Sequence, residues 1–137
     1  MPLMTNRGSG IRPWTALWPA VAYYAGIFWL SSQSRLPVGP SFRLSDKLAH
    51  GLLFAGFGAA LRLGFGAIRK DRPAWAARAS VWVGAWGAIL DELHQAFVPL
   101  RNPDPWDAAA DIAGVLAALG VISIIRKRRE KTHPRVP

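Results

Sequence analysis

Cysteine is absent from this sequence of 137 residues, and acidic residues are few: 8 Asp and Glu stand against 17 Lys and Arg, giving a formal net charge of +9. Without Cys, the chain has no disulfide framework, no thiolate metal site and no thiol nucleophile. A hydrophobic content of 51% excludes an intrinsically disordered chain, and the length fits one domain. So basic a chain usually suggests binding to nucleic acid, but seven Trp and a positive mean hydropathy of +0.15 are unusual for a soluble basic protein of this size.

Long hydrophobic segments alternate with short charged ones. Residues 13–34 carry no charge and are long enough to cross the roughly 30 Å hydrocarbon layer of a membrane. Three further segments reach that length when their polar flanks are included, with Arg62 and Arg78 extending toward a membrane surface. A soluble bundle would place polar residues at every third or fourth position, which the segment 81–90 (VWVGAWGAIL) lacks. A cleaved signal peptide ending near residues 32–34 is the alternative for the first segment, but its length and bulky aromatic residues favour a helix that is retained.

These segments predict an all-α fold: an integral membrane four-helix bundle in the plasma (inner) membrane, which the chain crosses several times. Helices are expected at about 14–33, 48–68, 74–95 and 105–125. They form a transmembrane domain, residues 14–125, between an N-terminal tail (1–13) and a basic C-terminal tail (126–137).

The distribution of Lys and Arg predicts the orientation of this bundle. Such residues gather in cytoplasmic loops and tails of membrane proteins. Thirteen of the 17 lie in the two tails or in the connection between the second and third helices with its adjoining helix ends. Both termini are therefore predicted to be cytoplasmic. The basic C-terminal tail is expected to orient the chain and to contact anionic lipid headgroups rather than nucleic acid.

The few acidic residues gather on the opposite side. Six of the eight, with two of the three His, fall at the predicted extracytoplasmic ends of the second, third and fourth helices. Helix capping accounts for Asp104 and Asp107 beside Pro105, but not for Asp111, which lies within the helix, where a charge facing lipid is costly. Residues three or four apart share a helix face, and three such polar strips result: Asp46 with His50, Asp91 with His94 and Gln95, and Asp107 with Asp111. A functional site and a purely structural hydrogen-bond network both fit this pattern.

The polar segments resemble those of the VanZ-like family of small multi-pass bacterial membrane proteins, named for a protein associated with resistance to teicoplanin-type glycopeptide antibiotics. The resemblance covers nearly the whole hydrophobic core. It rests on SSQ at 31–33, DKLAH at 46–50, DELHQAFVPLR at 91–101 and DAAADIAG at 107–114. The family more commonly has Asn at position 111, so Asp111 departs from its pattern. The resemblance implies a membrane protein that acts at the cell surface, in cell-envelope function or glycopeptide resistance, and it implies no particular reaction.

We expect the polar residues to bind an envelope lipid, a peptidoglycan precursor or a protein partner at the extracytoplasmic face. Arg101 and Lys47 would contact anionic groups, since Arg in particular pairs its fork of donors with phosphate. No nucleic-acid partner and no cofactor are predicted. The expected ligand-binding residues are Asp46, Lys47, His50, Asp91, Glu92, His94, Gln95, Arg101, Asp107 and Asp111.

An enzymatic alternative stays open, although a non-enzymatic role is favoured. An intramembrane hydrolase or transferase acting on an envelope lipid would use His94, Glu92 or Asp91 as its catalytic group. The spacing matches no established metal motif, and HExxH is absent. Proton-coupled transport is disfavoured because the first span contains no ionisable residue at mid-membrane depth apart from Tyr. Imidazole and carboxylate groups are nevertheless plausible ligands for a divalent metal, and the expected set is His50, His94, Asp91 and Asp107.

Labelling of single-Cys variants tests the predicted orientation, and the absence of native Cys makes the test direct. Pro103→Cys should react with a membrane-impermeant thiol reagent in intact cells, or in spheroplasts if there is an outer membrane. Asp71→Cys, between the second and third helices, should react only after the membrane is opened. The reverse labelling pattern would overturn both the orientation and the surface-facing site.

Overall fold

Four α-helices and one short 3-10 turn make up the described part of the computed structural model, residues 13–34 and 43–132. The turn η1 (Pro13–Leu17) leads into α1 (Trp18–Ser31), and α2 (Arg43–Ile68), α3 (Pro73–Gln95) and α4 (Pro105–Thr132) follow. These residues contain no strand, so the prediction of an all-α four-helix fold is confirmed. The predictions made for residues 1–12, 35–42 and 133–137 lie outside the described residues.

The helix boundaries follow local sequence signals. Pro73 and Pro105 begin α3 and α4, at positions where the missing N–H has no intrahelical partner to lose. Asp104 caps α4, since its Oδ1 accepts a hydrogen bond from the Trp106 N–H at 2.9 Å. Two helices are longer than the sequence predicts, because α2 begins at Arg43 and α4 continues to Thr132. Residues 126–132 thus extend α4, consistent with the high helix propensity of Arg, Lys and Glu.

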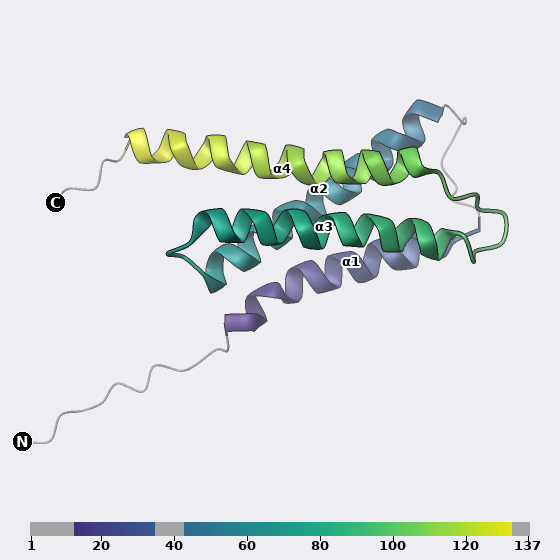
Figure 1. Cartoon of the computed structure of the whole chain (residues 1–137), viewed down its shortest axis with the longest axis horizontal. Coiled ribbons are helices and arrows are strands. Elements are labelled where there is room, and N and C mark those ends of the chain that lie inside the picture. The colour runs from purple at the N-terminus through teal and green to yellow at the C-terminus, as the bar shows by residue number, and fades with distance from the viewer. Residues whose placement is uncertain (1–12, 35–42, 133–137) are drawn as a thin grey trace, which may run out of the picture.

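The helix α2 contacts each of the other three helices, whereas α1 packs against α2 and α3. Figure 1 shows that α1 and α3 end, and α2 and α4 begin, at the same end of the bundle. Polar residues near these four helix ends are therefore brought together in space, although they are up to about 80 positions apart in the sequence. This arrangement positions the candidate site.

Glycines allow α4 to pack closely against α2 and α3. A Cβ added at Gly114 of α4 would overlap the carbonyl oxygen of Gly51 on α2, so a larger residue does not fit there. The next residue, Val115, is 1% exposed and packs against Gly58 of α2 and Gly84 of α3. An added Cβ at either of these two glycines would lie 2.9 Å from an atom of Val115. Small residues at such contacts are typical of helices that associate in membranes.

Large apolar side chains cover the outside of the bundle. Two described helices, α2 over Asp46–Ile68 and α4, are long and apolar enough by themselves to cross a membrane. The α-helical part of α1 has only 14 residues, and four complete spans remain a prediction. A soluble monomer rarely exposes so much aromatic surface. Six Trp side chains are at least 59% exposed: Trp14, Trp18, Trp29, Trp82, Trp86 and Trp106.

Replacing Gly114 with Ala should force α2 and α4 apart and lower the free energy of unfolding. Overpacking of this kind typically costs about 1–3 kcal/mol. Gly120→Ala in the same helix is the matched control, because a Cβ there meets no atom within 4 Å, and Ala should stabilise the helix by up to about 1 kcal/mol. Thermal unfolding of the purified proteins in detergent measures both effects, and equal Tm values for the two variants would contradict the close contact.

Candidate functional site

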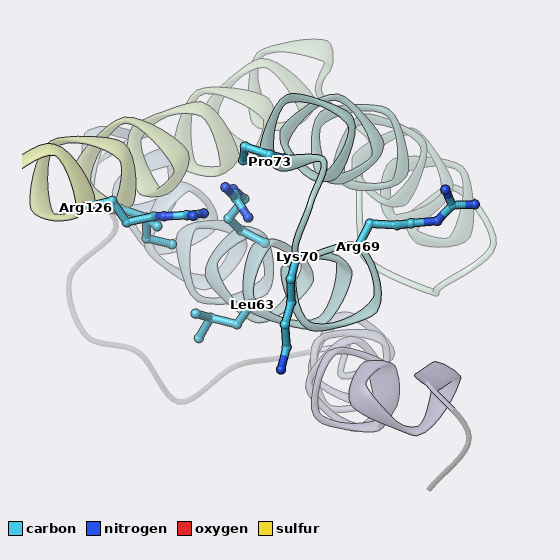
Figure 2. Close-up of a pocket in the computed structure, with 8 residues that line it drawn as sticks. Leu63, Arg69, Lys70, Pro73 and Arg126 are labelled. Atoms are coloured by element: carbon cyan, nitrogen blue, oxygen red, sulfur yellow. The ribbon is translucent and has the colours of Figure 1, made fainter. Parts of the chain in front are cut away.

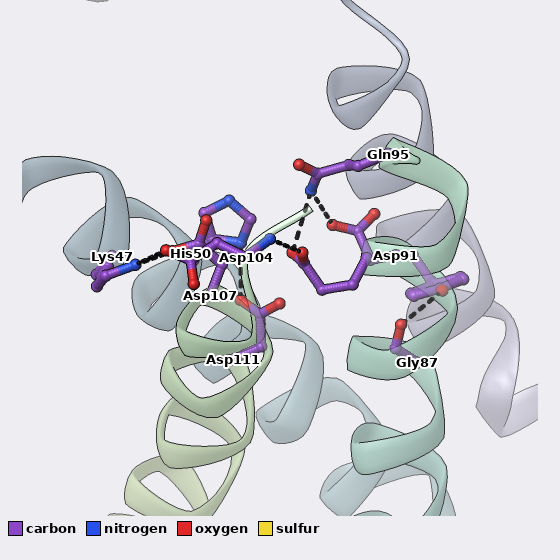
Figure 3. A network of polar contacts seen from close by, with 10 residues as sticks. Lys47, His50, Gly87, Asp91, Gln95, Asp104, Asp107 and Asp111 are labelled. Atoms are coloured by element: carbon purple, nitrogen blue, oxygen red, sulfur yellow. Dashed lines mark hydrogen bonds and ion pairs between the residues drawn. The ribbon is translucent and has the colours of Figure 1, made fainter. Parts of the chain in front are cut away.

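A cluster of polar side chains lies at the end of the bundle where α2 and α4 begin and α3 ends (Figure 3). Most of these side chains are buried, in a molecule whose outer surface is largely apolar. We call it the polar cluster, and its members are Lys47, His50, Asp91, Glu92, Gln95, Asp104, Asp107 and Asp111.

Lys47 joins the start of α2 to the start of α4. Its Nζ lies 2.7 Å from Oδ2 of Asp104 and 2.6 Å from Oδ1 of Asp107. The Asp107 side chain is only 8% exposed, while the Lys47 side chain is 31% exposed. The positive charge of Lys47 is therefore balanced by two carboxylates of the protein itself. Lys47 thus connects α2 to α4, and its ammonium group is less available to bind an external anion.

His50 and Asp111 form the second link between α2 and α4. The His50 Nδ1 lies 3.1 Å from Oδ1 of Asp111, whose side chain is fully buried. Asp111 thus faces a neighbouring helix, as expected for a carboxylate that would be costly against lipid. Gly114, one turn further along α4, permits the close helix approach that makes this contact possible.

Two carboxylates from the last turns of α3 complete the polar cluster. Asp91 Oδ2 accepts a hydrogen bond from Gln95 Nε2 at 3.0 Å, and Glu92 Oε2 accepts one from the backbone N–H of Asp104 at 2.8 Å. Asp91 Oδ1 and Asp111 Oδ2 are buried and have no hydrogen-bond partner within the described part of the chain. Buried polar atoms without partners are uncommon and costly in folded proteins.

His94 lies apart from these groups, although it is on the same helix as Asp91 and Glu92. Its ring stacks on Phe28 of α1 with 3.9 Å between ring centroids, and its Nε2 lies 2.9 Å from Ser32 Oγ. Consequently, neither group of described residues with donor atoms close enough to share a metal ion contains His94. The metal set expected from the sequence, which combined His94 with Asp107, is not brought together.

Arg101 and Asp46 border a small cavity beside the polar cluster. The cavity has a volume of about 40 Å³, and His50 and Asp91 also line it. Arg101 Nε donates a hydrogen bond to the carbonyl oxygen of Gln33 at 3.2 Å. The preceding residue, Leu100, has a φ of 66°, a left-handed conformation that L residues rarely adopt. The loop after α3 is thus held in an unfavourable backbone conformation next to the Arg101 side chain.

Three residues that support the site were not among the expected ligand-binding residues. Asp104 pairs with Lys47, Ser32 contacts His94, and Gln33 holds Arg101 through its carbonyl group. The sequence contained a signal for each, because Asp104 precedes Pro105 as a helix cap and the segment 31–33 belongs to the family resemblance. Neither signal predicted which side chain or backbone group each residue contacts.

A second polar region lies at the opposite end of the bundle, where α2 ends and α3 begins (Figure 2). It is a cavity of about 260 Å³, toward which the Arg126 side chain points, while Arg69 points away. Arg62, also in its lining, is 5% exposed, and its Nε has no hydrogen-bond partner among the described residues. Arg62, which was expected to extend toward a membrane surface, thus lines the cavity at this end of the bundle while staying buried. The remaining lining residues are Leu63, Gly66, Lys70, Pro73 and Ile122.

Comparison with known proteins supports the family resemblance noted in the sequence. No curated protein and no solved structure gives a significant match to the chain. The family model described as VanZ/LLP1 matches residues 9–126, which is most of the chain and includes every residue of the polar cluster. This match and the two helices able to cross a membrane together indicate a membrane protein, and the chain belongs to the VanZ/LLP1 family.

Proposed function

We propose that this chain is a multi-pass plasma-membrane protein that acts in cell-envelope function by binding a phosphate-bearing envelope lipid or peptidoglycan precursor at its extracytoplasmic face. The observation that carries this proposal is the cavity bordered by Arg101, Asp46, His50 and Asp91. Ionisable groups are costly in a membrane protein unless they pair or serve a function. Here they converge on one opening from α2, α3 and the loop after α3.

The distribution of charge supports the proposed orientation. The polar cluster and its carboxylates lie at one end of the bundle, whereas the cavity lined by Arg62, Arg69, Lys70 and Arg126 lies at the other. Basic residues favour the cytoplasmic side of the membrane, where they also attract anionic lipid headgroups. An anionic headgroup in the basic cavity would balance the buried charge of Arg62.

Arg101 is the residue best placed to contact a phosphate. Lys47 already has two carboxylate partners, whereas Arg101 uses Nε for a backbone carbonyl and borders the cavity. A guanidinium has five N–H donors in a planar fork that matches a phosphate. We therefore assign ligand contact to Arg101 and support of the helix ends to Lys47.

The potency of teicoplanin is a suitable functional readout, because the family is named for a protein associated with resistance to such antibiotics. Expression of the wild-type chain in a sensitive Gram-positive host should raise the inhibitory concentration. Arg101→Ala should remove most of this protection, because the fork of donors is lost. The inhibitory concentration of teicoplanin should fall at least about fourfold relative to cells that express the wild-type chain. Arg78→Ala, an exposed Arg near the start of α3, is the matched control and should retain protection. Full protection by Arg101→Ala at equal expression would reject the assignment.

Lys47→Met tests the supporting role of Lys47. The substitution leaves the nearly buried Asp107 carboxylate without its cation, so the Tm of the purified protein should fall. Adding Asp107→Asn to the same chain removes the uncompensated charge and should restore much of the lost stability. If Lys47→Met leaves the Tm unchanged and instead abolishes protection against teicoplanin, Lys47 contacts the ligand and our division of roles is wrong.

A further inference from the structure

We propose that His50, Asp91, Glu92 and Asp111 form a binding site for one divalent transition-metal ion, such as Mn²⁺ or Zn²⁺. The site lies inside the polar cluster, beside the cavity from which the proposed function is argued. The inference deepens that proposed function and rests on it. It differs from the metal set expected from the sequence by including Glu92 and Asp111 in place of His94 and Asp107.

The distances between the four side chains suit a single ion. Each residue offers one donor atom, and these four atoms all lie within 4.8 Å of one another. Bonds of about 2.1 Å to imidazole nitrogen and carboxylate oxygen place opposite ligands about 4.2 Å apart around an ion. A movement of less than about 1 Å by each side chain would close the set around one ion. One imidazole with three carboxylates is a donor set typical of Mn²⁺, Fe²⁺ or Zn²⁺.

Two of the four residues have a buried oxygen that the described part of the chain leaves without a hydrogen-bond partner. Asp91 is 1% exposed and Asp111 0% exposed, and the atoms concerned are Asp91 Oδ1 and Asp111 Oδ2. Such an atom costs free energy unless a donor or a cation satisfies it. A shared cation would satisfy both oxygens at once. Figure 3 shows Asp111 and His50 on one side of this space and Asp91 on the other.

The remaining oxygens of the α3 carboxylates are held in the way that metal-ligating carboxylates usually are. Gln95 Nε2 donates to Asp91 Oδ2, and the Asp104 N–H donates to Glu92 Oε2. Hydrogen bonds of this kind orient a ligand. They leave Asp91 Oδ1 for the ion, whereas Glu92 Oε1 also accepts a long hydrogen bond from Gln95 Nε2 at 3.5 Å, which an ion would replace. The loop between α3 and α4 and the side chain of Gln95 thus fix the two α3 ligands before an ion binds.

The charges around the site favour a cation. Three carboxylates from α3 and α4 face one His, and the nearest Lys, Lys47, is paired with Asp104 and Asp107. A second group of possible ligands, Asp46 with His50 and Asp107, shares His50. That group is less suited to an ion because Asp107 already contacts the Lys47 ammonium at 2.6 Å.

The cavity beside the polar cluster gives the ion access to a further ligand. His50 and Asp91 both line it, and its volume of about 40 Å³ is sufficient for a water molecule or one oxygen of a phosphate. An ion at this position would supply a second positive charge close to Arg101. Such an arrangement suits a phosphate-bearing ligand rather than a neutral one.

Metal analysis of the purified full-length chain in detergent tests this site. After equilibration with MnCl₂ or ZnCl₂ and removal of free ion, the wild type should retain about one equivalent by mass spectrometry. Asp91→Asn and Glu92→Gln should each weaken binding at least tenfold in calorimetric titration, because each removes a charged donor with little change of shape. Asp71→Asn, whose exposed side chain lies at the opposite end of the bundle, is the control and should bind as the wild type does. The ion should also raise the Tm of the wild type and of Asp71→Asn, but not that of the ligand variants.

Several outcomes would overturn the proposal. Absence of stoichiometric binding to the wild type would reject a metal site in this chain. Loss of binding in Asp107→Asn with retention in Asp91→Asn would place the ion at Asp46, His50 and Asp107 instead. Asp111→Asn helps to separate loss of the ion from misfolding. Asn has nearly the same shape as Asp, so this variant should fold while binding the ion more weakly. Failure of the metal test would leave the effect of Arg101→Ala on teicoplanin protection unaffected, so the two proposals fail separately.

Discussion

The close approach of α2 and α4 at Gly51 and Gly114 is the contact on which the rest of the structure depends. Because neither glycine has a side chain, the two backbones come near enough for His50 to meet Asp111 and for Lys47 to meet Asp104 and Asp107. Val115, the neighbour of Gly114, fills the space against α3 in the same way. Backbone packing and the placement of charged groups are thus two results of one helix contact.

Ionised groups gather at the two ends of the bundle because they are costly in contact with lipid. The two ends differ in the sign of the charge that they carry. Carboxylates and the His50 imidazole converge where α3 ends and where α2 and α4 begin, while basic side chains surround a cavity at the other end. Both regions contain buried polar atoms that no described residue satisfies, on Arg62 at one end and on Asp91 and Asp111 at the other. A folded chain normally pairs such atoms internally. Their presence is the reason why we propose that each end binds a group that the protein itself does not supply.

The roles that we propose for the cationic residues separate support of the helices from recognition of a ligand. Lys47 lies between two carboxylates of the adjoining helix and connects α2 to α4. Arg101 follows Leu100, whose left-handed conformation turns the loop, and it is held by the end of α1 through Gln33. The segments 31–33 and 91–101, on which the family resemblance rests, therefore contact each other in the folded chain.

Local sequence properties determined the helical fold and the collection of polar residues near one end. Long uncharged segments, prolines at helix starts and the three- or four-residue spacing of Asp and His are readable along the chain, because each depends on neighbours within one helix. The tertiary structure alone decided which side chains meet. Glu92 and Asp111 joined His50, whereas His94 turned to Phe28 and Ser32, and Lys47 was found already paired. These outcomes depend on how far each helix is rotated and how closely it approaches the next, which the spacing within a single helix does not specify.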